Sequence, residues 1–137
     1  MATPAPHDDG STTEAAVHRY RADLTWSGST GVGYDAYDRT HAVTCPPAAT
    51  GLTLSSDPAF RGDPALLDPE QLLLAAATSC QLLSFLAVAA RARLDVVAYE
   101  DRAEAVMPED DRPVRITTIA LRPRITVRGA GGEAADA

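Results

Sequence analysis

The stretch that most constrains the fold is a long apolar segment from Asp68 to Arg91, DPEQLLLAAATSCQLLSFLAVAAR. Its start carries the signals of a helix, because Asp68 can cap it and Pro69 suits the first helical position, where no N–H is needed. Between residues 72 and 90 the polar side chains are few and small, so nearly every face of this helix is apolar. Such a helix has to be covered by other structure, which predicts a long central helix buried in the core.

The composition is typical of a single soluble domain. The chain has 137 residues, enough for one domain with one core. Its formal net charge is −7, and an acidic balance disfavours nucleic acid or a membrane surface as a partner. The polar residues within the helix, with Asp68 and Arg91 at its ends, argue against a membrane span. The first residues lack the apolar stretch of a signal peptide, so we expect a cytoplasmic protein.

The rest of the chain alternates between apolar and polar residues on both sides of the helix. Residues 1–17 predict a disordered arm, residues 18–128 a single domain and residues 129–137 a flexible tail. Strands are expected at residues 18–26, 34–45, 50–54, 94–107 and 114–128. An ordered loop at residues 55–67 delivers the chain into the helix. The order of strands, one central helix and strands predicts an α+β fold.

Two irregularities are visible in the strands that follow the helix. Asp101 falls on an otherwise apolar strand face, which predicts either an arginine partner or a position near the margin of the sheet. In the last strand the apolar phase shifts between Ile116 and Ile119, which predicts a bulge near residues 117–118.

Two cysteines, Cys45 and Cys80, raise the question of thiol reactivity. They form no CxxC pair and have no pair of histidines nearby, so we expect no metal and no cofactor. In a reducing compartment two such cysteines are more often free thiols than a disulfide. Cys80 lies in the middle of the apolar helix, where the common role of a free cysteine is that of a small packed hydrophobe.

Several segments, taken together and in order, resemble the OsmC/Ohr family of thiol-dependent peroxidases for organic hydroperoxides. They are YDAYDRTH at 34–41, SSDPAFRGDP at 55–64, DPEQLLLAAATSC at 68–80, VVAYEDRAEAVM at 96–107 and LRP at 121–123. The resemblance covers residues 18 to 128. It implies an OsmC-like fold, in which antiparallel strands flank the central helix and two subunits intertwine as a homodimer. It also implies that Cys80 attacks the peroxide.

The sequence departs from the family pattern at two places. The family continues beyond the last strand with a helix that carries a second, resolving cysteine, and then a final strand, neither of which is found here. Gln81 stands where a histidine often follows the helix cysteine. Three alternatives therefore stay open: an active peroxidase, a catalytically incomplete relative that binds an apolar ligand or partner, and a piece of a longer chain.

A peroxidatic cysteine must be a thiolate, whereas an ordinary thiol, with a pKa of about 8.5, is mostly protonated at neutral pH. The dipole of the helix start fades within about one turn and does not reach Cys80, so an arginine or histidine has to supply the charge. By resemblance the candidate is Arg39, with Arg61 as second choice, and Glu70 orients the arginine. The alternatives are a salt-bridged surface residue for either arginine and a first-turn acid for Glu70.

Glu70 and Cys80 are about 15 Å apart on an ideal helix, so they cannot meet within one helix. Either a long arginine bridges toward them, or Glu70 comes from the partner subunit, which fits an intertwined dimer. We expect an apolar organic hydroperoxide as substrate and a dithiol as reductant. The predicted substrate-binding residues are Phe60, Leu73, Leu83, Phe85 and Arg61. Cys45 does not match the family's second-cysteine position, and we do not expect it to be the resolving thiol.

Overall fold

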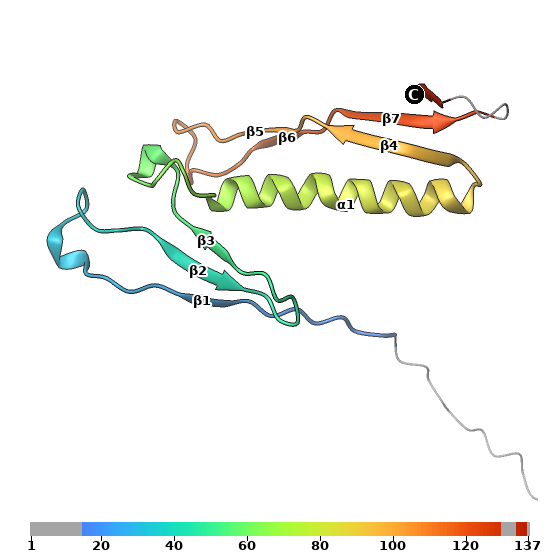
Figure 1. Ribbon diagram of the computed structural model, residues 1–137. Helices are drawn as coiled ribbons and strands as arrows, with labels where there is room; N and C mark the ends of the chain where they lie inside the picture. The colour runs from blue at the N-terminus through green and yellow to red at the C-terminus, as the bar shows by residue number, and fades with distance from the viewer. Residues whose placement is uncertain (1–14, 130–133, 137) are drawn as a thin grey trace, which may run out of the picture.

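The computed structural model describes residues 15–129 and 134–136, with one long helix and two groups of strands (Figure 1). The strands before the helix are β1 (Asp23–Thr25), β2 (His41–Thr44) and β3 (Leu52–Leu54). Two short 3-10 helices, η1 (Thr30–Val32) and η2 (Pro58–Phe60), precede the long helix α1 (Pro69–Arg91). The strands after it are β4 (Asp95–Asp101), β5 (Glu104–Val106), β6 (Thr118–Ala120), β7 (Pro123–Arg128) and β8 (Ala134–Asp136). This order confirms the predicted α+β class.

The helix α1 begins where the local signals predicted. Asp68 Oδ1 accepts the backbone N–H of Gln71 at 2.8 Å, and Gln71 Oε1 accepts the backbone N–H of Asp68 at 3.0 Å. These reciprocal bonds form a capping box, and Pro69 occupies the first turn, where it costs no hydrogen bond. Asp68 is 6% exposed, so its bonds also satisfy a buried carboxylate.

An antiparallel sheet of order β1-β2-β3 precedes the helix, with Leu24 opposite Val43 in its register. The predictions for the strands at residues 18–26 and 34–45 were too long. Residues 34–40 form a turn rather than a strand, because the N–H groups of Ala36 and Tyr37 both bond the carbonyl oxygen of Gly33. The expected strand over 18–26 is paired only within β1.

After the helix, β4 returns along α1 and pairs with β7, which pairs with β8, while β5 and β6 form a separate ribbon. The strand expected over 114–128 is split into β6 and β7. The predicted bulge near residues 117–118 is wrong, because β6 begins at Thr118 and pairs with β5 in regular register. A register slip lies instead between Val96 and Ala98 in β4. Residues 134–136, expected in a flexible tail, form β8. Most of the expected N-terminal arm lies outside the described residues.

Asp101 ties α1 to the sheet. Its Oδ2 accepts the hydroxyl of Thr78 at 2.5 Å, and its Oδ1 accepts the backbone N–H of Arg122 at 2.7 Å. Asp101 is the last residue of β4, so the second of the two predicted explanations, a position near the margin of the sheet, is confirmed. Farther along the helix, the rings of Phe85 and Tyr99 pack with their centroids 6.0 Å apart.

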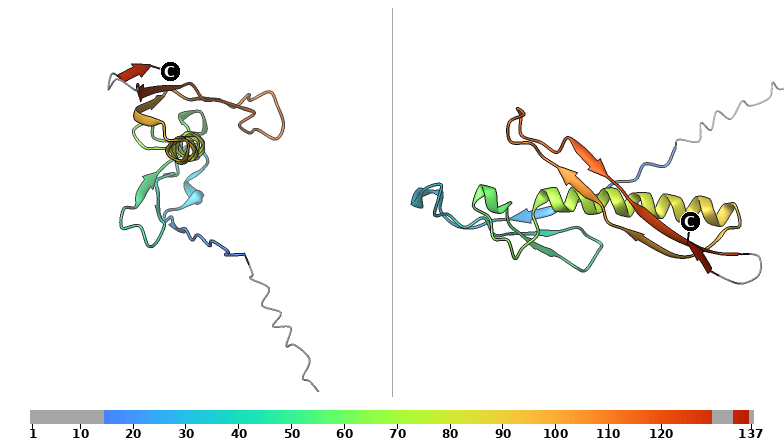
Figure 2. Two further views of the ribbon diagram at one scale, coloured as in Figure 1. Left: turned by 90° about the vertical axis from the view of Figure 1, so that its right-hand side faces the viewer. Right: turned by 90° about the horizontal axis from the view of Figure 1, so that it is seen from above.

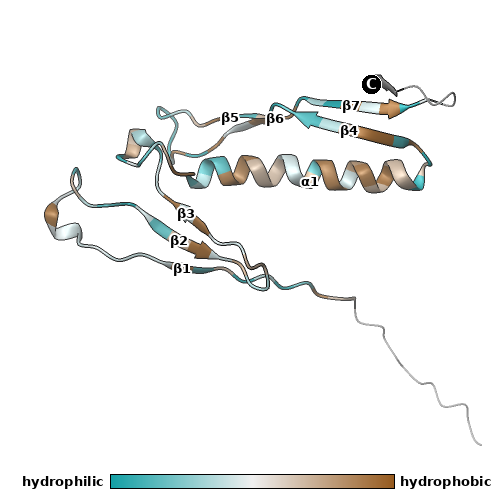
Figure 3. Cartoon of the chain, in the orientation of Figure 1, coloured by the Kyte–Doolittle hydropathy of each residue, from teal (hydrophilic) through white to brown (hydrophobic). Residues whose placement is uncertain are grey.

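The strands cover α1 on one side only. Figures 1 and 2 show β4 and β7 along one side of the helix, while β1, β2 and β3 run away from the other. Ala89 is the one buried residue of the helix, and Leu54 is the only other buried apolar residue in the described part of the chain. Leu83 is 63% exposed. The prediction of a buried central helix is therefore wrong for the single chain, although Figure 3 shows apolar residues along its whole length.

By length and composition alone, α1 is also apolar enough to cross a membrane. The strand beside it argues for a different role, because β4 lies at the edge of its sheet and runs along the helix. An open strand edge leaves backbone groups without partners, which hydrocarbon does not tolerate. This packing favours the core helix of a folded domain.

Candidate functional site

Cys80 lies in the middle of α1, on the side turned away from the strands. The contacts of Thr78 and Phe85, and the burial of Ala89, mark the covered side. On an ideal helix Cys80 is turned about 160° from the centre of that side. Its neighbours within about 60° on the same face are mostly apolar, with one small polar residue: Leu73, Ala76, Ala77, Leu83, Ser84 and Ala87. Cys80 is thus an exposed thiol at the centre of an open apolar surface, which we call the Cys80 face.

Within the described part of this one chain, no cation contacts the thiol. No hydrogen bond or ion pair joins Cys80 to Arg39 or to Arg61, whose own partners lie elsewhere. A thiolate needs a positive neighbour or hydrogen-bond donors to persist at neutral pH. The described residues of one chain therefore place no positive charge at Cys80.

Arg39 is held by two tyrosines in the turn before β2. Its Nη1 donates to the carbonyl oxygen of Tyr37 at 2.7 Å, and its Nη2 donates to that of Tyr34 at 2.5 Å. The guanidinium carbon lies 3.7 Å from the centroid of the Tyr37 ring and 4.9 Å from that of the Tyr34 ring. Such cation–π contacts are each worth about 0.5 to 2 kcal/mol. Arg39 is half-buried and makes no ion pair with any described residue.

The turn that carries Arg39 is fixed by further hydrogen bonds. The indole Nε1 of Trp26 donates to the carbonyl oxygen of Asp38 at 2.8 Å, and Asp38 Oδ1 accepts the backbone N–H of Thr40 at 2.8 Å. Hydrogen bonds from the backbone and then the side chain of Thr40 hold the pKa of Asp38 below its ordinary value. The lowered pKa favours the ionised carboxylate, which is the form that accepts these bonds.

Arg61, the second candidate, forms an ion pair with Asp35 through its Nε, at 3.2 Å from Oδ1. Both side chains are largely exposed, at 59% and 77%. Arg61 ends η2 in the left-handed conformation, with φ of 66°. The pair joins the loop before α1 to the turn that carries Arg39, which is the geometry of a salt-bridged surface arginine.

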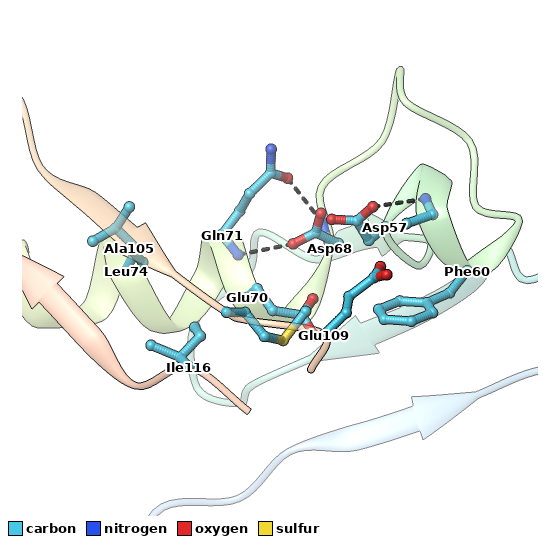
Figure 4. A pocket seen from close by; sticks show the side chains of 11 residues that line it. Asp57, Phe60, Asp68, Glu70, Gln71, Leu74, Ala105, Glu109 and Ile116 are labelled. Carbon is cyan, nitrogen blue, oxygen red and sulfur yellow. Dashed lines mark hydrogen bonds between the residues drawn. The ribbon is translucent and has the colours of Figure 1, made fainter. Parts of the chain in front are cut away.

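Glu70 lines a pocket of about 340 Å³ at the start of α1 (Figure 4). The apolar wall includes Phe60, Leu74, Met107 and Ile116, and the carboxylates around it belong to Asp57, Asp68, Glu70 and Glu109. Asp57 and Asp68 accept backbone N–H groups, as the dashed lines in Figure 4 show. Neither Glu70 nor Glu109 makes an ion pair with a described residue. Glu70 in the first helical turn is also favoured by the helix dipole.

A second depression, also of about 340 Å³, lies beside Arg39 and reaches Pro69 at the start of α1. Arg39 and Glu70 thus flank the same end of the helix. Cys80 is about 16 Å farther along the helix axis from Pro69. The structure brings the predicted arginine and carboxylate to one end of α1 and places the predicted nucleophile in its middle.

The predicted substrate-binding residues fall into separate groups in one chain. Phe60 lines the Glu70 pocket, and Leu73 and Leu83 share the Cys80 face. Phe85 packs against Tyr99 on β4, so it lies on the opposite side of α1 from the Cys80 face.

Tyr34 and Tyr37 were not predicted as site residues, because the turn that contains them was predicted to be a strand. An aromatic ring two residues before the candidate arginine, within a segment rich in aspartate, was the available signal. Cys45 is exposed and lines a hollow of about 710 Å³ with Tyr20 and Pro46. Within residues 15–129 and 134–136, no group of three or more His, Cys, Asp or Glu side chains could hold a metal ion.

Comparison with known proteins agrees with this architecture. The family model described as OsmC-like protein matches residues 62–137, which include α1 with Glu70 and Cys80. The fold is similar to that of an OsmC-like protein of unknown function from Vibrio cholerae, with a TM-score of 0.73 and 26% identity over 83% of this chain and 78% of that chain. A search of curated proteins finds no match. On the family match and the shared fold, this chain belongs to the OsmC-like protein family.

Proposed function

We propose that this protein is a thiol-dependent peroxidase that reduces organic hydroperoxides through Cys80. The observation that carries the proposal is the position of Cys80, an exposed thiol at the centre of the Cys80 face in an OsmC-like chain. A thiolate is a strong nucleophile, and the hydrocarbon around it suits the tail of an apolar peroxide better than a sugar or a nucleotide. We propose that the protein works in the cytoplasm, where thiol reductants are abundant.

The reaction needs one nucleophile and an external dithiol. The Cys80 thiolate attacks the terminal oxygen of the hydroperoxide, so that an S–O bond forms as the O–O bond breaks. The leaving alkoxide takes a proton and departs as an alcohol, and Cys80 is oxidised to a sulfenic acid. The first thiol of the reductant forms a mixed disulfide and releases water. Its second thiol then displaces Cys80 as the thiolate, and the reductant leaves as a disulfide.

The cation is supplied, in this proposal, by a second copy of the chain. A surface that exposes Leu73 at 52% and Leu83 at 63% is stabilised by about 25 cal/mol for each Å² of apolar area that association buries. Arg39 and Glu70 lie at the end of α1, too far from Cys80 of the same helix to touch it. A homodimer that packs the Cys80 face against the Arg39 end of the partner subunit would bury the apolar surface and bring a cation to Cys80.

The test is the consumption of cumene hydroperoxide with dithiothreitol, measured for the wild type, Cys80→Ser and the matched control Cys45→Ser. We expect Cys80→Ser to fall to the rate of the reductant alone, and Cys45→Ser to keep the wild-type rate. Equal rates for the wild type and Cys80→Ser would remove the proposal. Dimedone trapping distinguishes the alternative, since a catalytically incomplete relative would bind an apolar ligand without forming a sulfenic acid at Cys80.

A further inference from the structure

The Arg39 side chain, in the connection between β1 and β2, is fixed by contacts on several sides. Two carbonyl oxygens, those of Tyr34 and Tyr37, accept its terminal N–H groups. Two rings contact the guanidinium, and the rings themselves meet edge to face with centroids 6.3 Å apart. A long arginine side chain loses much rotamer freedom in such a setting, so its orientation is set before any substrate arrives.

We propose that Tyr37 is a positioning residue, whose ring holds the Arg39 guanidinium in the orientation in which it meets the thiolate and the peroxide. This inference rests on the proposed function. Of the two rings, that of Tyr37 is closer to the guanidinium carbon, at 3.7 Å against 4.9 Å for Tyr34. Tyr37 is also half-buried, whereas Tyr34 is 59% exposed, so Tyr37 has less freedom to move away.

The planar guanidinium explains why a ring suits this role. An aromatic ring covers the face of the guanidinium and leaves the N–H groups, which lie in its plane, to other acceptors. The two carbonyl oxygens use N–H groups of Nη1 and Nη2, and a guanidinium carries five N–H donors in all. The donors left over can serve a thiolate and a peroxide oxygen at the same time.

The arrangement also allows the ring to be tested apart from the backbone. The carbonyl of Tyr37 belongs to the main chain, so its bond to Arg39 does not depend on the side chain at position 37. Tyr37→Leu removes the ring, and Tyr37→Phe retains it. Tyr20 is 93% exposed and contributes no ring to Arg39, which makes Tyr20→Leu a matched control.

The first experiment measures the orientation of Arg39 directly by NMR of the full chain. The ring current of Tyr37 is expected to move the Arg39 side-chain proton resonances upfield, with assignment by Arg39→Lys. The shift should persist in Tyr37→Phe and become clearly smaller in Tyr37→Leu, where the Tyr34 ring alone remains. Arg39 resonances that are equal in the wild type and in Tyr37→Leu would overturn the inference.

The second experiment measures the thiolate at Cys80 by its rate of alkylation with iodoacetamide near pH 6.5, in a Cys45→Ser background. We expect Tyr37→Leu to be alkylated about tenfold more slowly than the wild type, the size expected from one lost cation–π contact. Tyr37→Phe and Tyr20→Leu should both be alkylated at the wild-type rate. Because Tyr37 acts through Arg39, Tyr37→Leu should have no further effect in an Arg39→Ala background. A full additional loss in that background would overturn the inference.

The two proposals fail separately. A wild type that reduces no hydroperoxide would end the proposed function, and the alkylation of Cys80 would still decide the role of Tyr37. Slower alkylation in Tyr37→Leu than in Tyr37→Phe supports the positioning role, and equal alkylation overturns it.

Discussion

At the scale of single residues, Asp38 shows how the turn that carries Arg39 keeps its shape. The backbone N–H of Thr40 and then its hydroxyl bond the carboxylate and hold its pKa below the ordinary value of 3.8. Because the pKa is depressed in the folded state, this stabilisation is fully present above pH 3.8 and is lost as the pH falls through the lower, folded value. The contribution of these bonds to the turn is therefore present at neutral pH.

Thr40→Ala removes the side-chain bond to Asp38 and leaves the backbone bond in place. We expect the pKa of Asp38 to rise part of the way toward its ordinary value, because the hydroxyl is the smaller of the two causes. An NMR titration of the Asp38 carboxyl group measures it, with Thr118→Ala in β6 as the control. An unchanged pKa in Thr40→Ala would contradict this explanation of the turn.

Gly62, in the loop before α1, has no room for a side chain. A Cβ atom there would lie 1.6 Å from the carbonyl oxygen of Ser56, and that oxygen cannot move without moving the backbone. We expect Gly62→Ala to lower the free energy of unfolding by about 3 kcal/mol or more, as measured by urea unfolding. The control is Gly31→Ala, where the nearest atom is the hydroxyl of Ser29 at 3.2 Å. Equal stability of the two variants would show that the loop backbone can move to accommodate the Cβ atom, and would contradict this prediction.

At the scale of elements, α1 has one occupied side and one open side. On the occupied side, Thr78 bonds Asp101 and Phe85 packs against Tyr99, both residues of β4. The open side is the Cys80 face, which carries Leu73 and Leu83 outward among small residues. A helix that is apolar on both sides needs cover on both sides. The open side of α1 is therefore where the proposed dimer has to form.

Leu83→Glu places a charge on this open side. We expect the dimer to weaken to a monomer at micromolar concentration, because the carboxylate would lose its hydration on association. Sedimentation equilibrium measures the mass, and the control is Val17→Glu, at an apolar residue 72% exposed outside the helix. The dimer proposal is wrong if Leu83→Glu and the wild type sediment alike as dimers, or if the wild type is a monomer.

The element scale also shows what can be read from sequence. The start of α1 was predictable because its determinants, Asp68 and Pro69, act within one turn. The turn at Tyr34 was mistaken for a strand because alternation of apolar and polar residues does not report bonds to the carbonyl oxygen of Gly33. The splitting of the last two strands depends on pairing across the sheet, which no local pattern encodes.

At the scale of the whole molecule, one chain encloses little apolar surface. Leu54 and Ala89 are the buried apolar residues of the described part of the chain, which is too few for an independent core. In the proposed dimer, folding and association are coupled, so its stability is expected to depend on the concentration of the chain. The same requirement explains why the site was only partly predictable: Arg39, Glu70 and Cys80 were named from the resemblance, but no pattern in one chain shows which copies supply them.

The most direct measurement of the central claim, that Cys80 of one copy is activated by Arg39 of another, is complementation between two inactive variants. Cys80→Ser and Arg39→Ala chains with different tags are coexpressed, and the heterodimer is purified. One of its two sites then combines an intact Cys80 with an intact Arg39 of the other chain. We predict about half the peroxidase activity of the wild-type dimer, because one of two symmetric sites is restored. A heterodimer as inactive as the two homodimers would contradict the claim.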